Sequence, residues 1–213
     1  MKKNSIYLTL LFVCCNTFAQ NSGKAATLLN EVASKMASYT TMHIDFSYEL
    51  INTEVDIKQE SSGSVITKAE KYNLNFMDNI FIHDGKNTYV IVTEDEEVNV
   101  IEGGDEEDLL NPSKLLFFYK EGYQYEWKNS KIIKNKKIQF IKLIPIDSNT
   151  EASHFVLGID VANKHIYNIS ETGENSTVTT FTIDNLSVNE VTPEKVFEFD
   201  EAAYAQKNYT INN

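Results

Sequence analysis

The chain contains no arginine. All 19 of its basic residues are lysines, against 31 acidic residues, and the formal net charge is −12. Lysine lacks the planar fork of donors with which arginine binds a phosphate or a carboxylate through two parallel hydrogen bonds. Nucleic acids and anionic membranes attract proteins with clustered positive charge, so a strongly acidic surface repels them. The composition therefore argues against a nucleic-acid-binding protein.

Cysteine is almost as scarce, and both cysteines, Cys14 and Cys15, lie near the N-terminus. The first residues have a basic start, an apolar stretch and small residues up to Ala19, the layout of a secretory signal. The apolar stretch is shorter than the about 20 residues that span a bilayer. Neither cysteine follows a small residue, as the lipidated cysteine of a lipoprotein would. We expect 1–19 to be a cleaved signal peptide and 20–213 to be one domain without thiols, whose net charge is −14 because two lysines are lost.

The sequence has no recognisable catalytic or metal-binding motif. The four histidines are dispersed: His43, His83, His154 and His165. None has the i, i+4 spacing of a helical metal site, and no G-x-S-x-G element is present. The acidic runs 94–97 and 105–108 lack the spacing of a calcium loop and are interpreted as solvated turns, with docking to a basic partner as an alternative. We expect no metal and no cofactor, although acidic residues are numerous enough for a hydrolytic carboxylate pair.

From Met42 onward, apolar and polar side chains alternate, as in 44–50, 72–76 and 123–127. This period of two is typical of strands with one apolar face. The segment His83–Lys86 contains Asp-Gly and predicts a hairpin with a type I′ turn. Further breaks are expected near residues 52–53, 129–130, 135–136, 162–163 and 172–174. An antiparallel meander of roughly eleven strands tends to curl toward a barrel.

Two helices interrupt this β pattern. Residues 24–38 carry apolar side chains at helical spacing, which predicts an amphipathic helix packed on the sheet. Asn111 and Pro112 have the chemistry of a helix cap and a first helical position, with acidic residues before them. The helix expected over 111–119 is apolar nearly all round. Such a helix is either an ordinary core helix or the cover of an apolar cavity.

The order of motifs resembles that of the LolA-type periplasmic lipoprotein carriers of Gram-negative bacteria. The resemblance covers nearly all of 20–213 and rests on these features: the N-terminal helix, the strand around Phe46, the strand pair containing Gly63, Lys68–Leu74, Ile82–Lys86 with Tyr89, Asn111-Pro112 with its apolar helix, Leu143-Ile144-Pro145 and Phe197-Glu198-Phe199. The Asp-Gly-Lys hairpin and the Asn-Pro helix are its most specific parts.

The resemblance implies a mainly β fold with a few helices (α+β), in which a curved antiparallel sheet forms an incomplete, unclosed β-barrel with a helical lid over an apolar cavity. It also implies a monomeric periplasmic carrier that receives acylated lipoproteins from an inner-membrane lipoprotein-releasing transporter and passes them to an outer-membrane acceptor. No enzymatic activity is expected. The acyl-chain cavity is predicted to be formed by Phe46, Tyr48, Leu50, Leu74, Phe76, Phe81, Tyr89, Ile91 and Trp127.

The lid is predicted to present Leu115, Leu116 and Phe118 to this cavity. The family often has an arginine that holds the lid closed, and the aligned residue here is Lys68, which we predict to be a weaker latch because it has no planar fork. Two alternatives remain open at this point: an exported enzyme that acts on lipid or glycan, and a module that binds envelope proteins through its acidic turns.

Overall fold

The computed structural model describes residues 4–103, 112–147 and 149–212, so the predicted acidic run at 105–108 and the cap Asn111 lie outside the described residues. The elements, in chain order, are α1 (Asn4–Ala37), β1 (Thr41–Asn52), β2 (Ile57–Lys68), β3 (Lys71–Phe76), β4 (Asn79–His83), β5 (Asn87–Val92), β6 (Glu97–Glu102), α2 (Pro112–Leu115), the 3₁₀ helix η1 (Phe118–Lys120), β7 (Tyr123–Ile133), β8 (Lys136–Pro145), β9 (Ala152–Asp160), β10 (His165–Gly173), β11 (Val178–Val188), the 3₁₀ helix η2 (Glu194–Phe197), α3 (Glu201–Gln206) and β12 (Thr210–Asn212).

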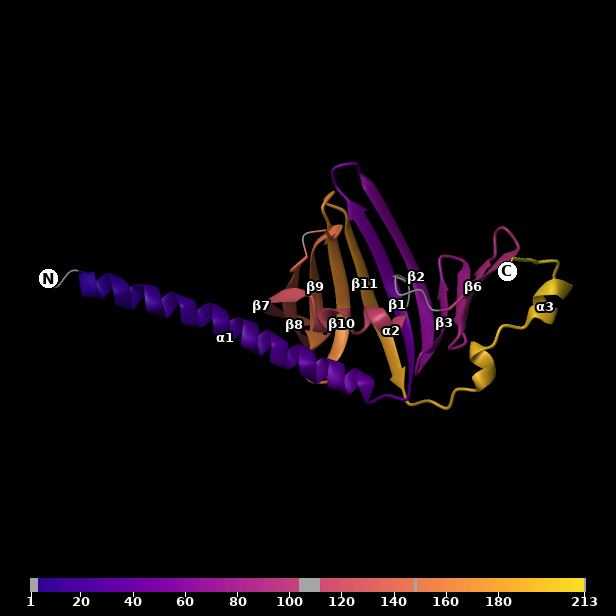
Figure 1. Cartoon of the computed structure of the whole chain (residues 1–213), viewed down its shortest axis with the longest axis horizontal. Coiled ribbons are helices and arrows are strands. Elements are labelled where there is room, and N and C mark those ends of the chain that lie inside the picture. The colour runs from indigo at the N-terminus through magenta and orange to yellow at the C-terminus, as the bar shows by residue number, and fades with distance from the viewer. Residues whose placement is uncertain (1–3, 104–111, 148, 213) are drawn as a thin grey trace.

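The described strands form one 12-stranded sheet in the order β12-β6-β5-β4-β3-β2-β1-β11-β10-β9-β8-β7. Two antiparallel meanders, β1 to β6 and β7 to β11, meet where β1 pairs with β11. The sheet curves strongly, but its two edge strands, β12 and β7, do not pair with each other (Figure 1). The predicted incomplete β-barrel is therefore confirmed. The parallel pairing of β12 with β6 is a departure from the all-antiparallel prediction.

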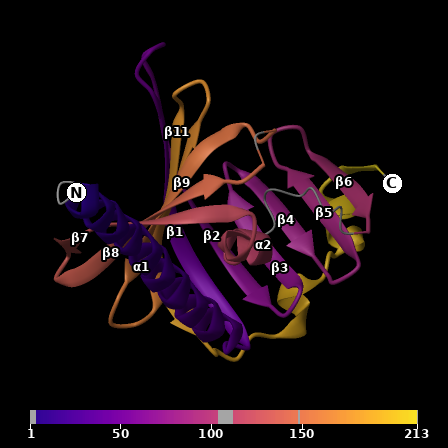
Figure 2. The same cartoon turned by 60° about the vertical axis from the view of Figure 1, so that its left-hand side comes forward.

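Helix α1 lies across the inner, concave face of the sheet, and α2 lies in front of β1 to β3 (Figure 2). The apolar stripe of α1 is buried as predicted. Its residues are 6% exposed or less: Ala25, Leu28, Leu29, Val32, Ala33 and Met36. They belong to the main hydrophobic core, together with Ile44, Val65 and Leu74 of the inner face. The amphipathic periodicity of the sequence was therefore enough to predict that this helix packs on the sheet.

The central helix is shorter than predicted. Pro112 begins α2 as expected, but the helix ends at Leu115 and the chain continues into η1. The amide of Leu116 donates to the carbonyl of Pro112, whereas the amide of Phe117 donates to Lys114, three residues back. This shorter bond tightens the turn, as commonly happens at the end of an α-helix. The predicted single helix is therefore two short pieces.

Most of the predicted turns are confirmed, with two corrections. The Asp-Gly hairpin joins β4 to β5, but its central pair is Gly85-Lys86, because Asp84 and Asn87 are bonded across the turn. Only Gly85 of this turn has a positive φ, 96°, so the turn is not of type I′. The break near 129–130 is wrong: β7 continues through it with a register shift between Trp127 and Ser130.

The segment after β11 covers the outer face of the sheet near β6 (Figure 1). Phe197 of η2 is fully buried, and Asn73 of β3 donates to the carbonyl of Val196. A second apolar cluster lies farther along this face. It comprises the buried Ile82, Ile91 and Val98, with Ile80, Tyr89, Phe199, Tyr204, Tyr209 and Ile211 packed against them. Both faces of this half of the sheet are therefore apolar.

Candidate functional site: an apolar cavity

A cavity of about 80 Å³ lies between the inner face of the sheet and α2. Every side chain that lines it is apolar. The lining residues are Ile44, Phe46, Val65, Leu74, Phe76, Pro112, Leu115, Leu116, Ile169, Phe181 and Ile183. Because a water-sized group occupies about 30 Å³, this partly open cavity has room for about three such groups. A long acyl chain therefore exceeds the space that the cavity offers in this conformation.

Strand alternation and pairing explain why these residues converge. Ile44 lies opposite Val65, and Val65 lies opposite Leu74, so the three form one row across β1, β2 and β3. Residues that are directly paired project to the same face of a sheet. Phe46 and Phe76 occupy the next row, with Gly63 between them. Alternation along each strand therefore carries the apolar surface from one row to the next.

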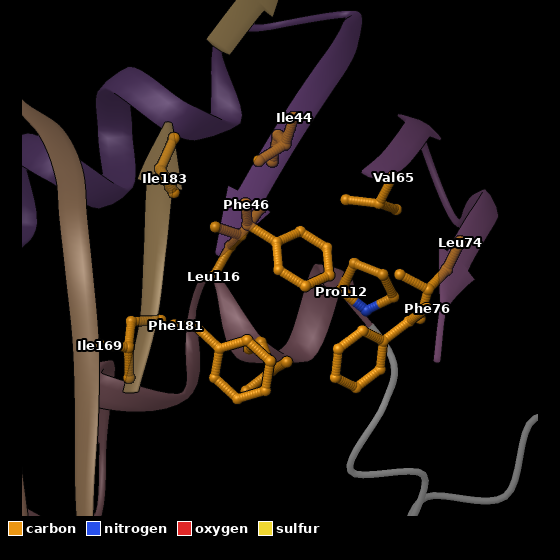
Figure 3. A pocket seen from close by; sticks show the side chains of 11 residues that line it. Ile44, Phe46, Val65, Leu74, Phe76, Pro112, Leu116, Ile169, Phe181 and Ile183 are labelled. Carbon is orange, nitrogen blue, oxygen red and sulfur yellow. The ribbon is translucent and has the colours of Figure 1, made fainter. Parts of the chain in front are cut away.

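Aromatic rings form the far end of the cavity. The ring centroid of Tyr48 lies 5.2 Å from those of Phe76 and Phe181, and that of Phe46 lies 5.5 Å from Phe76. Figure 3 shows the rings of Phe46, Phe76 and Phe181 directed toward the same space as Leu116. Burial raises the pKa of the Tyr48 hydroxyl, so this end of the site holds an uncharged phenol. Such a surface suits an aliphatic chain and offers no charge to a polar ligand.

The lid is attached to the sheet at η1, its C-terminal end. Phe118 packs on Phe155 of β9, with ring centroids 4.9 Å apart. The hydroxyl of Tyr125 donates to the carbonyls of Tyr119 and Lys120, at 2.8 and 3.0 Å. These carbonyls end a short helix and have no further helical partner. Tyr125 therefore has the anchoring role that the sequence analysis gave to Lys68.

Five of the predicted site residues line the cavity: Phe46, Leu74, Phe76, Leu115 and Leu116. Other predicted site residues lie at the margins of the cavity.

Tyr48 belongs to the aromatic end, and Leu50 follows it on the same face of β1. Phe81, Phe118 and Trp127 pack against the main core without lining the cavity. Trp127 instead borders a shallow groove beside α1.

Tyr89 and Ile91 require a correction, because they lie on the outer face. Val90 pairs with Phe81 on the inner face, so its two neighbours on β5 project outward. Ile91 is fully buried in the outer cluster, and the ring of Tyr89 stacks on Phe199 at 4.6 Å. The predicted register was wrong by one residue, an error that exchanges the two faces of a strand.

The latch assigned to Lys68 is also corrected. The ammonium group of Lys68 forms an ion pair with Glu194 of η2, and Lys71 Nζ lies 3.1 Å from the same carboxylate. The hydrogen bonds from Lys68 and Lys71 lower the pKa of Glu194. All three side chains are substantially exposed. In the described part of the chain, Lys68 thus joins β2 to the C-terminal segment.

The sequence analysis missed six lining residues: Ile44, Val65, Pro112, Ile169, Phe181 and Ile183. Ile44 was recognised as part of an alternating strand, but β10 and β11 were not assigned an inner face. Their alternating residues Ile169, Phe181 and Ile183 carried a usable signal. The pairing of β1 with β11 spans more than a hundred residues of sequence and could not be read from local pattern.

The polar groups nearest the site do not form a reactive centre. Within the described residues, no three His, Cys, Asp or Glu side chains gather as a metal site would require. Glu171 lies on the inner face beside Phe155, in a separate recess that also contains Glu151 and Glu174. Burial, and then the charge of Glu151, raise the pKa of Glu171. The chemistry available in the cavity itself is the binding of apolar groups.

Across the part of the chain that the structure describes, no helix is both long and apolar enough to cross a membrane. Comparison of the sequence with protein-family models and with curated proteins gives no match. Comparison with solved structures gives many matches.

The similarity to solved structures extends over most of the chain. An uncharacterized conserved protein from Thermus thermophilus is 8% identical, with a TM-score of 0.56, over 85% of this chain and 96% of that one. The Mycobacterium tuberculosis lipoprotein LppX is 14% identical, with a TM-score of 0.52, over 80% and 98%. A LolA superfamily protein from Nitrosomonas europaea is 10% identical, with a TM-score of 0.44, over 83% and 98%. The fold of this chain is therefore similar to those of LppX and of the Thermus thermophilus protein.

Proposed function

We propose that this protein is a periplasmic carrier that binds the acyl chains of lipoproteins in the apolar cavity and shuttles them from the inner to the outer membrane. The observation that carries the proposal is the cavity lining, in which every described side chain is apolar and α2 supplies Pro112 and Leu115, followed by Leu116. The carrier acts without catalysis, since these side chains include no nucleophile and no general base. The resemblance of the motif order to that of the LolA-type carriers supports the same assignment.

The energetics suit reversible transfer. Burial of each methylene group contributes about 0.8 kcal/mol, so a single long acyl chain gains on the order of 10 kcal/mol before any cost. In the closed state Leu116 is only 5% exposed, and entry of cargo displaces it from this position. The loss of the lid's own contacts offsets part of the gain and keeps the net affinity moderate. A carrier that must also release its cargo needs such a moderate affinity.

The carrier requires a donor and an acceptor. In this proposal the protein acts as a monomer, takes acylated lipoproteins from an inner-membrane lipoprotein-releasing transporter, and delivers them to an outer-membrane acceptor where one is present. The lid is anchored at η1, so opening requires separation of α2 from β2 and β3 while Tyr125 still holds the carbonyls of η1.

Acyl-chain binding to a cavity-directed variant tests the proposal. We expect a fluorescent fatty-acyl probe to bind one site per chain and Leu116→Asp to abolish binding, because an unpaired carboxylate cannot be buried among aliphatic groups. Val55→Asp is the matched control, since it adds the same carboxylate at a side chain that is 61% exposed in the β1–β2 turn. Circular dichroism confirms that each variant is folded.

The nature of the cargo is tested separately. Mass spectrometry of material extracted from the natively purified protein should recover acylated polypeptide. Recovery of a sugar or a phosphate compound alone, or equal probe binding by a folded Leu116→Asp variant, contradicts the proposal.

A further inference from the structure

Positive charge is concentrated in one hairpin of this acidic protein. Residues 127–146 contain six lysines and no Asp or Glu, although acidic residues outnumber lysines by 31 to 19 in the whole chain. These lysines are Lys128, Lys131, Lys134, Lys136, Lys137 and Lys142. All of them lie on β7, on β8 or in the turn between these strands. The hairpin is therefore an island of positive charge on a protein of opposite sign.

The hairpin is rigid and projects beyond its neighbour. Lys134 and Asn135 form its turn with φ values of 47° and 62°, the two positive values that a type I′ turn requires. The last residue of β8 paired to β9 is Ile138, so the tip from Lys131 to Lys137 extends past the end of β9. Figure 2 shows the hairpin at the left-hand edge of the sheet, beside α1. A single bond, from the amide of Val161 to the carbonyl of Lys137 at 3.1 Å, supports its base.

Four of these six lysines, Lys131, Lys134, Lys137 and Lys142, have no carboxylate within ion-pair distance among the described residues. Lys128 pairs with Glu126 at 2.5 Å, and Lys136 lies 3.8 Å from Asp160. Among the described residues, no carboxylate lies within ion-pair distance of Lys131, Lys134 or Lys137, and all three are exposed. The uncompensated charge of the hairpin is thus concentrated at its tip.

An exposed apolar side chain lies among these charges. Ile132 is 71% exposed, and it is paired with Lys137, so both project to one face of the hairpin. Lys131 and Ile133 project to the other face, and Lys134 occupies the turn. Prevention of aggregation is by itself a sufficient explanation for many lysines on edge strands. That explanation does not account for Ile132, which is 71% exposed at the same tip.

We propose that the tip of the β7–β8 hairpin, residues Lys131–Lys137, is a docking surface for anionic phospholipid membranes. Lysines around a projecting aliphatic side chain bind lipid phosphates while the apolar group enters the headgroup region. A surface that binds an acidic protein partner would carry its lysines on one face. Here the lysines surround the tip, and Ile132 is exposed among them. The inference goes beyond the proposed function and does not depend on what the cavity binds. It differs from the expectation that the acidic surface repels anionic membranes.

Vesicle cosedimentation tests this surface. The protein is used as it is isolated from the cells that produce it. We expect binding to phosphatidylglycerol vesicles that weakens as salt is raised, and little binding to phosphatidylcholine vesicles. The triple variant Lys131→Glu, Lys134→Glu, Lys137→Glu should lose on the order of a hundredfold in affinity. The variant Ile132→Ser should bind more weakly with an unchanged salt dependence. A matched control carries the same three charge reversals at exposed lysines elsewhere, Lys86, Lys195 and Lys207, and should bind like the parent.

Three results would overturn the proposal: no binding of the parent to phosphatidylglycerol at low salt, equal loss in the control triple variant, or parent-like binding by the hairpin variant while it remains folded. Displacement of vesicles by polyglutamate together with parent-like binding of Ile132→Ser would assign the surface to an acidic protein instead. Acyl-probe binding is measured on the same samples. A hairpin variant that loses vesicles but keeps the probe separates this surface from the cavity.

Discussion

Phe46 of β1 lies directly opposite Gly63 of β2, and its ring occupies the space that a side chain at position 63 would need. A Cβ at Gly63 would also lie only 2.7 Å from the carbonyl oxygen of Asn75. The glycine therefore allows the ring to lie flat against the sheet, where it forms part of the cavity. The resemblance pointed to this glycine, and the structure gives the physical reason for it.

We expect Gly63→Ala to destabilise the protein by about 1–3 kcal/mol, the usual cost of overpacking a core. Urea denaturation measures the change. Gly23→Ala is the matched control, because a Cβ there meets no atom within 4 Å. It should leave stability unchanged or raise it by up to about 1 kcal/mol, since alanine favours the helix. A Gly63→Ala protein as stable as the parent would show that the Phe46 ring can move aside freely.

Tyr125→Phe should loosen the lid. The substitution removes the only hydroxyl that bonds the carbonyls of Tyr119 and Lys120 within the described residues, at a cost of about 1 kcal/mol. We expect faster entry of an acyl probe, measured by stopped-flow fluorescence, with little change in the closed cavity. Tyr123→Phe is the control, because Tyr123 shares the strand and face but its hydroxyl makes no bond to another described residue. Equal rates of probe entry in the two variants would show that the Tyr125 hydroxyl does not anchor the lid.

Local pattern predicted the inner face correctly where one face of a strand is clearly more apolar. On β1, the polar residues Asp45 and Ser47 alternate with Phe46 and Tyr48, so the orientation of the strand is unambiguous. On β5, Val90 projects inward and Ile91 outward, and both are apolar. Alternation cannot orient a strand that is covered on both sides.

The covering of the outer face depends on distant parts of the chain. The C-terminal segment packs on strands that precede it by about a hundred residues, which no local window detects. Glu194 is part of that segment, and its position determines the role of Lys68. Local pattern could not place Lys68 beside Glu194 for this reason.

Lys68→Leu is now expected to change little. The residue forms an exposed ion pair with Glu194, and such pairs contribute about 0–1 kcal/mol. Probe entry and probe affinity should match those of the parent, because the pair lies on the outer side of β2 and does not contact α2. Lys71→Leu, which removes the second partner of Glu194, provides the comparison and should behave in the same way. Altered probe entry in Lys68→Leu alone would restore the latch assignment.

Glu171 gives a prediction for the dependence of stability on pH. Burial of its carboxyl group, with a smaller contribution from the charge of Glu151, raises its pKa. The folded protein therefore retains this proton to a higher pH than the unfolded chain does, and the charged form disfavours folding. The penalty is complete above the folded pKa and disappears as the pH falls below the ordinary range of a glutamate, about 4.3.

Glu171→Gln should consequently be more stable than the parent at pH 7, and this advantage should vanish near pH 4. Urea denaturation at several pH values measures it. Glu174→Gln is the control, because Glu174 lies in the same recess but is exposed, so its effect on stability should be smaller. If Glu171→Gln were instead less stable at pH 7, the carboxylate would have a favourable partner in the folded state, and burial would not be its dominant interaction.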